Sequence, residues 1–165
     1  PILLHVDDVD VPAALAACAI ARAVGLPITS DIESASAASL IEAVTIPILA
    51  EAVPAELTGR TDPVEALREL RRPRHQMLVA TLGPRGAVAI VGDEVYRVPG
   101  VAVDTVDTTG AGDIFRGAFI AAWLEGRPPL EILQWANAAA ALSCTGSGAI
   151  DSVPSRDDIR RLSGV

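Results

Sequence analysis

Residues 107–113 read DTTGAGD, a string in which two threonines and two glycines precede a single carboxylate. A glycine-rich turn that leads into a helix exposes backbone N–H groups, and the helix dipole adds partial positive charge. Gly110 and Gly112 lack a β-carbon, so an anion can approach the backbone closely. A carboxylate beside such an anion site suits transfer of a phosphoryl group to an alcohol, because it can accept the hydroxyl proton.

A purely structural explanation of this string is equally open at this point. Asp113 falls in the first turn of the expected helix, where an acidic side chain interacts favourably with the helix dipole. The string is not a Walker A loop, because no Lys-Ser or Lys-Thr pair follows it, and it lacks the spacing of a dinucleotide-binding fingerprint. These residues alone therefore predict either a helix cap or a phosphoryl-transfer site.

Two other glycine-containing segments could belong to the same site. TLGPRG, at residues 81–86, predicts a tight turn between two strands, and the turn could also line a ligand site. Residues 136–154 predict a helix of small residues that ends near Gly146 and Gly148, which alone would be ordinary residues after a helix C-terminus.

The elements that must position these segments follow from the hydrophobic pattern. Strands are expected at 2–7, 26–33 and 46–52, and they alternate with helices at 10–25, 36–44 and 62–72. This alternation predicts a largely parallel sheet with helices on its faces. Strands at 76–83, 86–92 and 94–100 are joined by turns too short for a helix, so they predict an antiparallel meander at the sheet edge. Helices at 110–126, 130–146 and 154–163 complete a single α/β domain spanning residues 1–165.

Composition narrows the class of protein further. Half of the 165 residues are hydrophobic, enough for a real core, and the net charge of −8 argues against nucleic acid as a partner. The one basic cluster, at residues 68–75, is expected at a helix end, where cations favour the dipole. Cys18 and Cys144 are interpreted as small buried hydrophobes in a reducing compartment. Neither a membrane span nor a signal peptide is evident, so we expect a cytoplasmic protein.

Taken together and in this order, the segments resemble the ribokinase family of carbohydrate kinases, the phosphofructokinase-B type. The resemblance extends from ILLHVDD at the start, through TLGPRG and DTTGAGDIFRGAF, to ANAAAALSCTGSGA. It implies a three-layer α/β fold, ATP and Mg²⁺ as cofactors, and a sugar or sugar-like substrate. It also implies that this chain corresponds to the C-terminal part of a family member, with the N-terminal half missing, and a homodimer is an option for the full-length protein.

The resemblance also assigns roles to individual residues. Asp113 is similar to the catalytic base, and the backbone of Gly110, Ala111 and Gly112 to the anion hole for the phosphoryl group. The positions that match the nucleotide-binding residues are Thr81, Gly83, Gly86 and Asn137. The positions that match a monovalent cation site, occupied by K⁺ in many members, are Asp107, Thr109, Gly148 and Ser152. Asp7 matches an acidic sugar contact, although an aspartate at a strand end is more often a loop cap.

The chain departs from the family pattern at one motif. Many members carry Asn-x-x-Glu ahead of Leu-Thr-Gly, and this motif is associated with magnesium and phosphate. Alignment on Leu57, Thr58 and Gly59 puts Ala50 and Val53 at those positions, so both functional side chains are absent. Glu51 lies nearby at the wrong position and is expected to be solvated.

Three hypotheses remain from the sequence. The first is that the parent protein is an ATP-dependent sugar kinase, of which this chain holds the nucleotide site and the catalytic base. The second is a truncated, non-catalytic nucleotide-binding remnant of such a kinase. The third is a structural α/β domain without a nucleotide site, which the combination of TLGPRG and DTTGAGD disfavours. The sugar and the phosphorylated hydroxyl are not specified by these residues.

Overall fold

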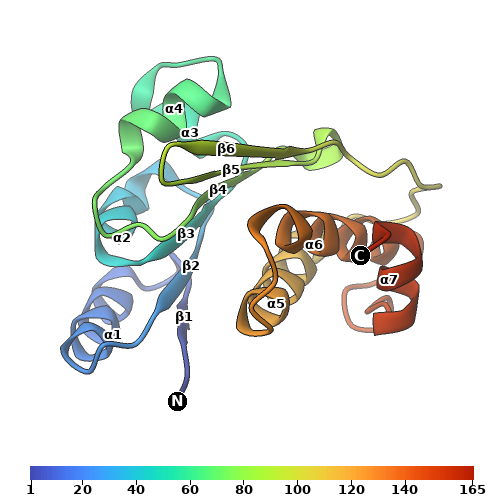
Figure 1. Cartoon of the computed structure of the whole chain (residues 1–165), viewed down its shortest axis with the longest axis horizontal. Helices are drawn as coiled ribbons and strands as arrows, with labels where there is room; N and C mark the ends of the chain where they lie inside the picture. The colour runs from blue at the N-terminus through green and yellow to red at the C-terminus, as the bar shows by residue number, and fades with distance from the viewer. The chain divides into compact units, whose positions relative to one another are not determined.

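Strands and helices alternate through the first half of the chain in the computed structural model, which describes residues 1–165 (Figure 1). The strands are β1 (Leu4–Val6), β2 (Ile28–Ile32), β3 (Ile46–Leu49), β4 (Leu78–Thr81), β5 (Ala87–Val91) and β6 (Glu94–Val98). The α-helices are α1 (Val11–Ala23), α2 (Ala38–Ala43), α3 (Val53–Thr58), α4 (Pro63–Leu70), α5 (Ala111–Leu124), α6 (Pro129–Ser143) and α7 (Arg156–Ser163). Two short 3₁₀ helices are η1 (Ala35–Ala37) and η2 (Gly83–Arg85).

The chain divides into two compact units. The first comprises Pro1–Leu82 with Val88–Tyr96, and the second comprises Gly83–Ala87 with Arg97–Val165. The first unit contains the four N-terminal strands and α1 to α4, whereas the second contains η2 and the helices α5 to α7. That the whole chain acts as one domain stays a prediction.

Strands β1 to β4 form a parallel sheet in chain order. His5 pairs with Thr29, Ser30 with Pro47, and Ile48 with Val79, all in parallel register. Each connection passes through at least one helix, which is the crossover that parallel neighbours require. The predicted parallel sheet is therefore confirmed.

Strands β5 and β6 extend the same sheet, whose order is β1-β2-β3-β4-β5-β6 (Figure 1). Only Gly92 and Asp93 separate β5 from β6, and a connection of two residues joins neighbouring strands only when they are antiparallel. Five residues separate β4 from β5, again too few for a crossover helix. This edge is the predicted meander.

The core of the first unit forms between the sheet and its helices. Apolar residues of β2, β3 and β4, among them Ile28, Leu49 and Leu78, are fully buried in one cluster with Cys18 of α1 and Leu40 of α2. Burial of such side chains is the dominant favourable term in folding. The alternating pattern predicts this arrangement because each helix must cover the face of the strands it connects.

Two helices in this unit begin at a capping aspartate. Asp10 accepts a hydrogen bond from the N–H of Ala13 at 3.0 Å, and Asp62 accepts one from Val64 at 3.1 Å. Both caps are followed by a proline in the first turn, where the missing N–H has no cost. Two details differ from the prediction: the helix expected at 36–44 is divided into η1 and α2, and α3 was not expected.

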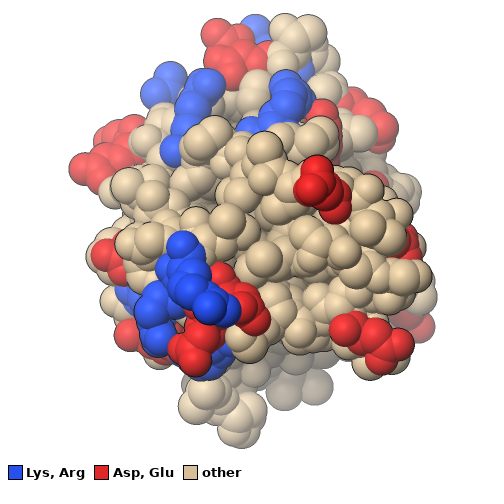
Figure 2. Space-filling model, turned by 90° about the vertical axis from the view of Figure 1, so that its right-hand side faces the viewer, with Lys and Arg blue, Asp and Glu red and all other residues tan.

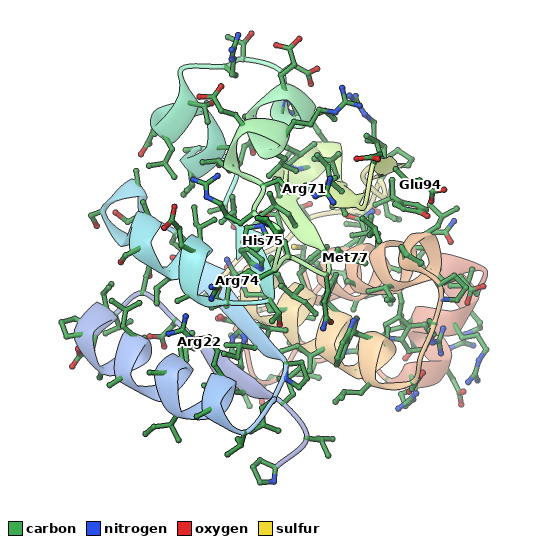
Figure 3. The ribbon with its side chains drawn as sticks, turned by 60° about the vertical axis from the view of Figure 1, so that its left-hand side comes forward. Arg22, Arg71, Arg74, His75, Met77 and Glu94 are labelled. Atoms are coloured by element: carbon green, nitrogen blue, oxygen red, sulfur yellow. The ribbon has the colours of Figure 1, made fainter.

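The basic segment that follows α4 is held by acidic partners. Arg71 pairs with Asp93 at 3.2 Å and Arg72 with Glu42 at 3.1 Å. Figure 3 labels Arg71, Arg74 and His75 on this segment. The side chain of His75 is buried, in contrast to the exposed Arg74. These ion pairs support the interpretation of this segment as part of the fold.

The second unit is built on packed helices. Helix α5 packs on α6, which in turn packs on α7, and Ser155 caps α7 by accepting a hydrogen bond from the N–H of Asp158. Cys144 follows α6 as its C-cap and is partly exposed, so the prediction of two buried cysteines is right only for Cys18. On the face shown in Figure 2, basic and acidic side chains are interspersed. None of the helices has the length and apolar character needed to cross a bilayer.

Candidate functional site

The glycine turn before α5 forms the N-terminus of that helix. Gly110 is the N-cap, with φ of +75°, a left-handed conformation that favours glycine. A β-carbon on Gly110 would lie 2.5 Å from the β-carbon of Ala149, so a side chain is excluded for a second reason. The turn is therefore closed on one side by the 148–149 segment.

The backbone N–H groups of this turn are not equivalent. The N–H of Ala111 donates to the carbonyl oxygen of Thr108 at 3.1 Å, and that of Ile114 donates to Gly110 at 2.9 Å. Gly112 and Asp113 lie between them in the first helical turn, where N–H groups have no acceptor within the helix. Of the residues predicted to form an anion hole, Gly112 is thus better placed to donate than Ala111.

Asp113 lies in the first turn of α5 and is exposed to solvent. Its Oδ2 atom lies 4.0 Å from the position that a β-carbon on Gly110 would take, so the carboxylate is directed back toward the glycine turn. This carboxylate does not cap the helix: the N-cap is Gly110, and no side-chain cap hydrogen bond is formed there. Asp113 remains in the first turn, where its charge interacts favourably with the helix dipole, and its role as a catalytic base stays a prediction.

Asp107 joins the turn to the loop after α6. Its Oδ1 atom accepts hydrogen bonds from the N–H of Thr109 at 2.9 Å and from the Thr109 hydroxyl at 2.7 Å. Its Oδ2 atom accepts a hydrogen bond from the N–H of Gly148 at 2.9 Å. The N–H groups of Thr109 and Gly148, with the Thr109 hydroxyl, lower the pKa of Asp107 from 3.8 to about 2, because they stabilise the ionised carboxylate.

The loop that contains Gly148 borders a cavity of about 490 Å³. Its lining combines apolar groups with hydroxyl and carboxylate oxygens, from Leu142, Thr145, Gly146, Ser147, Asp151, Ser152, Val153, Pro154 and Asp158. Ser152 also packs against Gly146 so closely that a β-carbon there would collide with its hydroxyl. Of the four residues predicted to hold a monovalent cation, the structure links Asp107, Thr109 and Gly148 directly, and Ser152 lies in the same loop.

The oxygen atoms of these four residues suit a hard cation in kind. The Asp107 carboxylate already accepts three hydrogen bonds, so an ion would have to share it with those donors. No group of three or more histidine, cysteine or acidic residues that could hold a metal is present. The binding of a monovalent cation at these residues stays a prediction.

The second glycine turn is shaped by close backbone approaches. Gly86 has φ of +98°, and a β-carbon on it would lie 2.6 Å from the carbonyl carbon of Pro99. Gly100 approaches Pro84 equally closely. Asn137, on α6, is buried, and its Nδ2 atom donates to the carbonyl oxygen of Pro99 at 2.7 Å. The 99–100 segment therefore brings the predicted nucleotide residues Gly86 and Asn137 close together within the second unit.

The remaining predicted residues are placed in different parts of the chain. Thr81 ends β4 in the first unit, and its hydroxyl donates to Leu49 at 3.4 Å, whereas Gly83 begins η2 in the second unit. Asp7 follows β1 and accepts a hydrogen bond from the N–H of Val9 at 3.1 Å, the loop-cap arrangement. Its role as a sugar contact stays a prediction.

Sequence reasoning missed two charged residues of interest. Asp8 accepts hydrogen bonds from the N–H groups of Glu33 and Ser34, at 2.9 Å and 2.8 Å, and so joins the loops that follow β1 and β2. Arg116, on α5, is buried beside Gly112. A charged residue inside the otherwise apolar stretch that follows Asp113 was the available signal for Arg116.

The first unit has a sheet of mainly parallel strands, and the second has a glycine turn at the N-terminus of α5. Parallel strands joined by helices define an α/β protein. Residues 4–156 match the model of the pfkB family of carbohydrate kinases, and the chain belongs to this family.

Individual relatives agree with this assignment. The chain is 36% identical over 115 residues to fructokinase-1 of Oryza sativa subsp. japonica and 39% identical over 85 residues to ribokinase of Bacillus subtilis (strain 168). These matches cover 64% and 52% of this chain but only 35% and 29% of the relatives.

Solved structures match almost the entire chain. A ribokinase candidate from Agrobacterium tumefaciens is 30% identical with a TM-score of 0.88, and the match covers 97% of this chain and 54% of that one. A ribokinase II candidate from E. coli, solved with ATP and Mg²⁺, is 26% identical with a TM-score of 0.86 and coverage of 98% and 58%. The expected α/β fold is therefore confirmed, and the chain spans a little over half the length of these proteins.

Proposed function

We propose that this chain is the nucleotide-binding and catalytic-base portion of an ATP-dependent kinase that phosphorylates a hydroxyl group of a sugar or sugar-like molecule. Membership of the pfkB family of carbohydrate kinases supports the reaction class. The observation that carries the proposal is the position of Asp113, whose carboxylate is directed toward the glycine turn at the N-terminus of α5.

The proposed reaction requires a base and an anion site in one place. Asp113 accepts the proton of the sugar hydroxyl while the hydroxyl oxygen forms a bond to the γ-phosphorus of ATP. The bond from that phosphorus to the oxygen bridging the β-phosphate breaks, and ADP leaves with the electron pair. The N–H groups of Gly112 and Asp113, with the helix dipole, stabilise the negative charge on the group in transfer.

The nucleotide is proposed to lie along the second glycine turn. Thr81, Gly83 and Gly86 would line the phosphates and ribose, and Asn137 would line the adenine pocket. The E. coli relative was solved with ATP and Mg²⁺, which supports both cofactors. Because Ala50 and Val53 offer no ligand, Mg²⁺ would be held mainly by the phosphates and water, as magnesium often is.

A monovalent cation such as K⁺ is proposed at the loop that Asp107 ties to the turn. The oxygens of Asp107, Thr109, Gly148 and Ser152 would hold it, and its charge would favour the phosphoryl group nearby. Asp7 remains the proposed sugar contact. The fructokinase and ribokinase relatives support a sugar as the substrate class.

The proposal is tested by replacing Asp113 with Asn in a polypeptide extended upstream to the length of its relatives. General-base catalysis typically contributes about 100-fold or more, so turnover on a sugar panel should fall by at least that factor with ATP affinity retained. Asp104→Asn, which removes an exposed carboxylate from the preceding segment, is the matched control and should retain full turnover. Wild-type turnover in the Asp113→Asn variant would falsify the assignment of the base.

A second candidate function is nucleotide binding without catalysis. Ala50 and Val53, in place of the family's Asn and Glu, favour it. It predicts that the 165-residue chain binds ATP in calorimetry, and that the extended polypeptide phosphorylates no member of the panel.

A further inference from the structure

Arg116 is a charged residue on the buried face of α5. Only 4% of its surface is exposed, and it shares this face with Phe115, Phe119 and Ala122. The rings of Phe115 and Phe119 lie next to each other, with centroids 6.3 Å apart. Arg116 is the only charged residue among the buried residues of α5.

The direction of the side chain brings its charge to the start of the helix. Side chains on a helix lean toward the N-terminus, so a long side chain covers the residue one turn earlier. A β-carbon on Gly112 would lie 3.4 Å from Cζ of Arg116 and 3.7 Å from Nη2, and would collide with Nη1. The guanidinium therefore lies against the α-carbon of Gly112, in the turn that carries Asp113.

This contact gives Gly112 a second function. The sequence predicts a glycine there so that an anion can approach the backbone, and the structure adds that only a glycine leaves room for the guanidinium. The two functions are compatible, because the N–H groups of a first turn point along the helix axis whereas the guanidinium lies beside it. The charge is permanent, since arginine stays protonated at any physiological pH.

We infer that Arg116 supplies a fixed positive charge to the phosphoryl-group site at the N-terminus of α5 and acts there as a positioning residue. The inference rests on the proposed function of this site. The half-charge of the helix N-terminus and the full charge of the guanidinium then act on the same anion. Their effect increases with the negative charge of the ligand and is absent for a neutral one.

A structural role alone makes a different prediction. If Arg116 only anchors α5, its replacement lowers the melting temperature and lowers the affinities for ATP, ADP and adenosine by a similar factor. The ratio between the affinities for ATP and adenosine separates the two roles, because the ligands share the base and ribose but differ in charge. ADP adds a second comparison, since it lacks the γ-phosphoryl group.

The experiment measures Kd for ATP, ADP and adenosine by calorimetry, with Mg²⁺ present, for the 165-residue chain and its variants. We expect Arg116→Met to raise the Kd for ATP by about 10- to 100-fold, which is the range of one charge-assisted interaction. The Kd for ADP should rise less, and the Kd for adenosine should not change. Arg116→Lys should recover part of the ATP affinity. Arg160→Met, which removes the same charge from α7, is the matched control and should change none of the three.

Gly112→Ala provides an independent measurement, because it displaces the guanidinium without removing it. Its effect on ATP affinity should be smaller in the Arg116→Met background than in the wild type, which a double-mutant cycle detects. Equal effects in both backgrounds, or an unchanged ATP-to-adenosine ratio in Arg116→Met, overturn the inference while the proposed function stands. If the wild-type chain binds adenosine but not ATP, or neither ligand, both are overturned. If Arg116→Met fails to fold, Arg116→Lys and Gly112→Ala decide by the same ratio.

Discussion

The carboxylate of Asp107 accepts a hydrogen bond from the N–H of Gly148 at 2.9 Å, across 41 positions of sequence. The next residue, Ala149, lies against Gly110, so the loop after α6 and the glycine turn before α5 are held together at two adjacent points. The conformation of the glycine turn therefore depends on the loop after α6.

Loss of the hydrogen bonds that Asp107 accepts should change how the stability of the chain depends on acidic pH. The pKa of Asp107 is lowered in the folded state to about 2 from 3.8, so its stabilising effect is complete above the unfolded value and is lost as the pH falls through the folded one. We expect Asp107→Asn to destabilise the chain near neutral pH. The variant should also lose less stability than the wild type as the pH falls from about 4 to about 2. Melting temperatures across this range check it, with Asp104→Asn as the control, and parallel curves for wild type and Asp107→Asn would contradict the prediction.

Substitution of Gly110 and of Gly117 by alanine should change the free energy of unfolding in opposite directions. Gly110→Ala places a β-carbon in a left-handed conformation and against Ala149, which should lower the free energy of unfolding by about 1–3 kcal/mol. Gly117 lies within α5 with open space around its α-carbon, so Gly117→Ala should raise that free energy by about 0.5–1 kcal/mol. Urea unfolding measures the free energy of unfolding of both variants. If Gly117→Ala is destabilised and Gly110→Ala is unchanged, the conformation of the turn differs from the one described.

His75 should make the first unit sensitive to mildly acidic pH. Its Nδ1 atom accepts from the N–H of Arg72 at 3.1 Å and its Nε2 atom donates to Ile41 at 2.7 Å, an arrangement that only the neutral ring can make. Burial is the largest cause of the lowered pKa of His75, and the charges of Arg72, Arg74 and Arg71 act in the same direction. Protonation is therefore less favourable in the folded state, and stability should fall as the pH drops below about 6.5, the unfolded value.

The chain has only two histidines, so the assignment of this effect is straightforward. His75→Gln should remove most of the pH dependence of the unfolding free energy between about pH 7 and pH 5, although it is less stable at neutral pH. His5→Gln, at the partly solvated edge strand, should retain the wild-type dependence. The opposite result, with the dependence removed by His5→Gln, would assign it to the hydrogen bond between His5 and Thr29.

The order of strands and helices could be predicted because local signals agreed with one another. Asp10 with Pro12 and Asp62 with Pro63 mark two helix starts, and the two-residue connection at Gly92 fixes the direction of β6. Helix α3 was missed because it has six residues and carries a proline near its start, which suggests a loop when the fold is unknown. Local pattern is therefore informative wherever an element is long enough to repeat its period.

The arrangement of the site was less accessible to sequence reasoning. The DTTGAGD string identifies the turn, but no spacing rule indicates that Asp107 reaches Gly148 or that Asn137 reaches Pro99. Burial of Arg116 was also unpredictable, since charged residues are seldom fully buried and the sequence does not show which face of α5 is covered. These features depend on contacts between segments far apart in the chain.

Charged side chains surround the indole ring of Trp135, and their interactions with it should stabilise the second unit. The guanidinium of Arg127 lies 4.2 Å from the centroid of its indole ring, that of Arg156 lies 5.8 Å away, and both arginines pair with Glu125. A cation over an indole ring contributes about 0.5–2 kcal/mol, depending on its burial, and Trp135 is buried. Arg127→Met, which keeps much of the apolar stem, should lower the free energy of unfolding by about 1 kcal/mol, whereas Arg160→Met on α7 should leave it nearly unchanged. Urea unfolding followed by tryptophan fluorescence provides the measurement, and equal effects of the two substitutions would show that the interaction with the ring adds nothing to the general loss of charge.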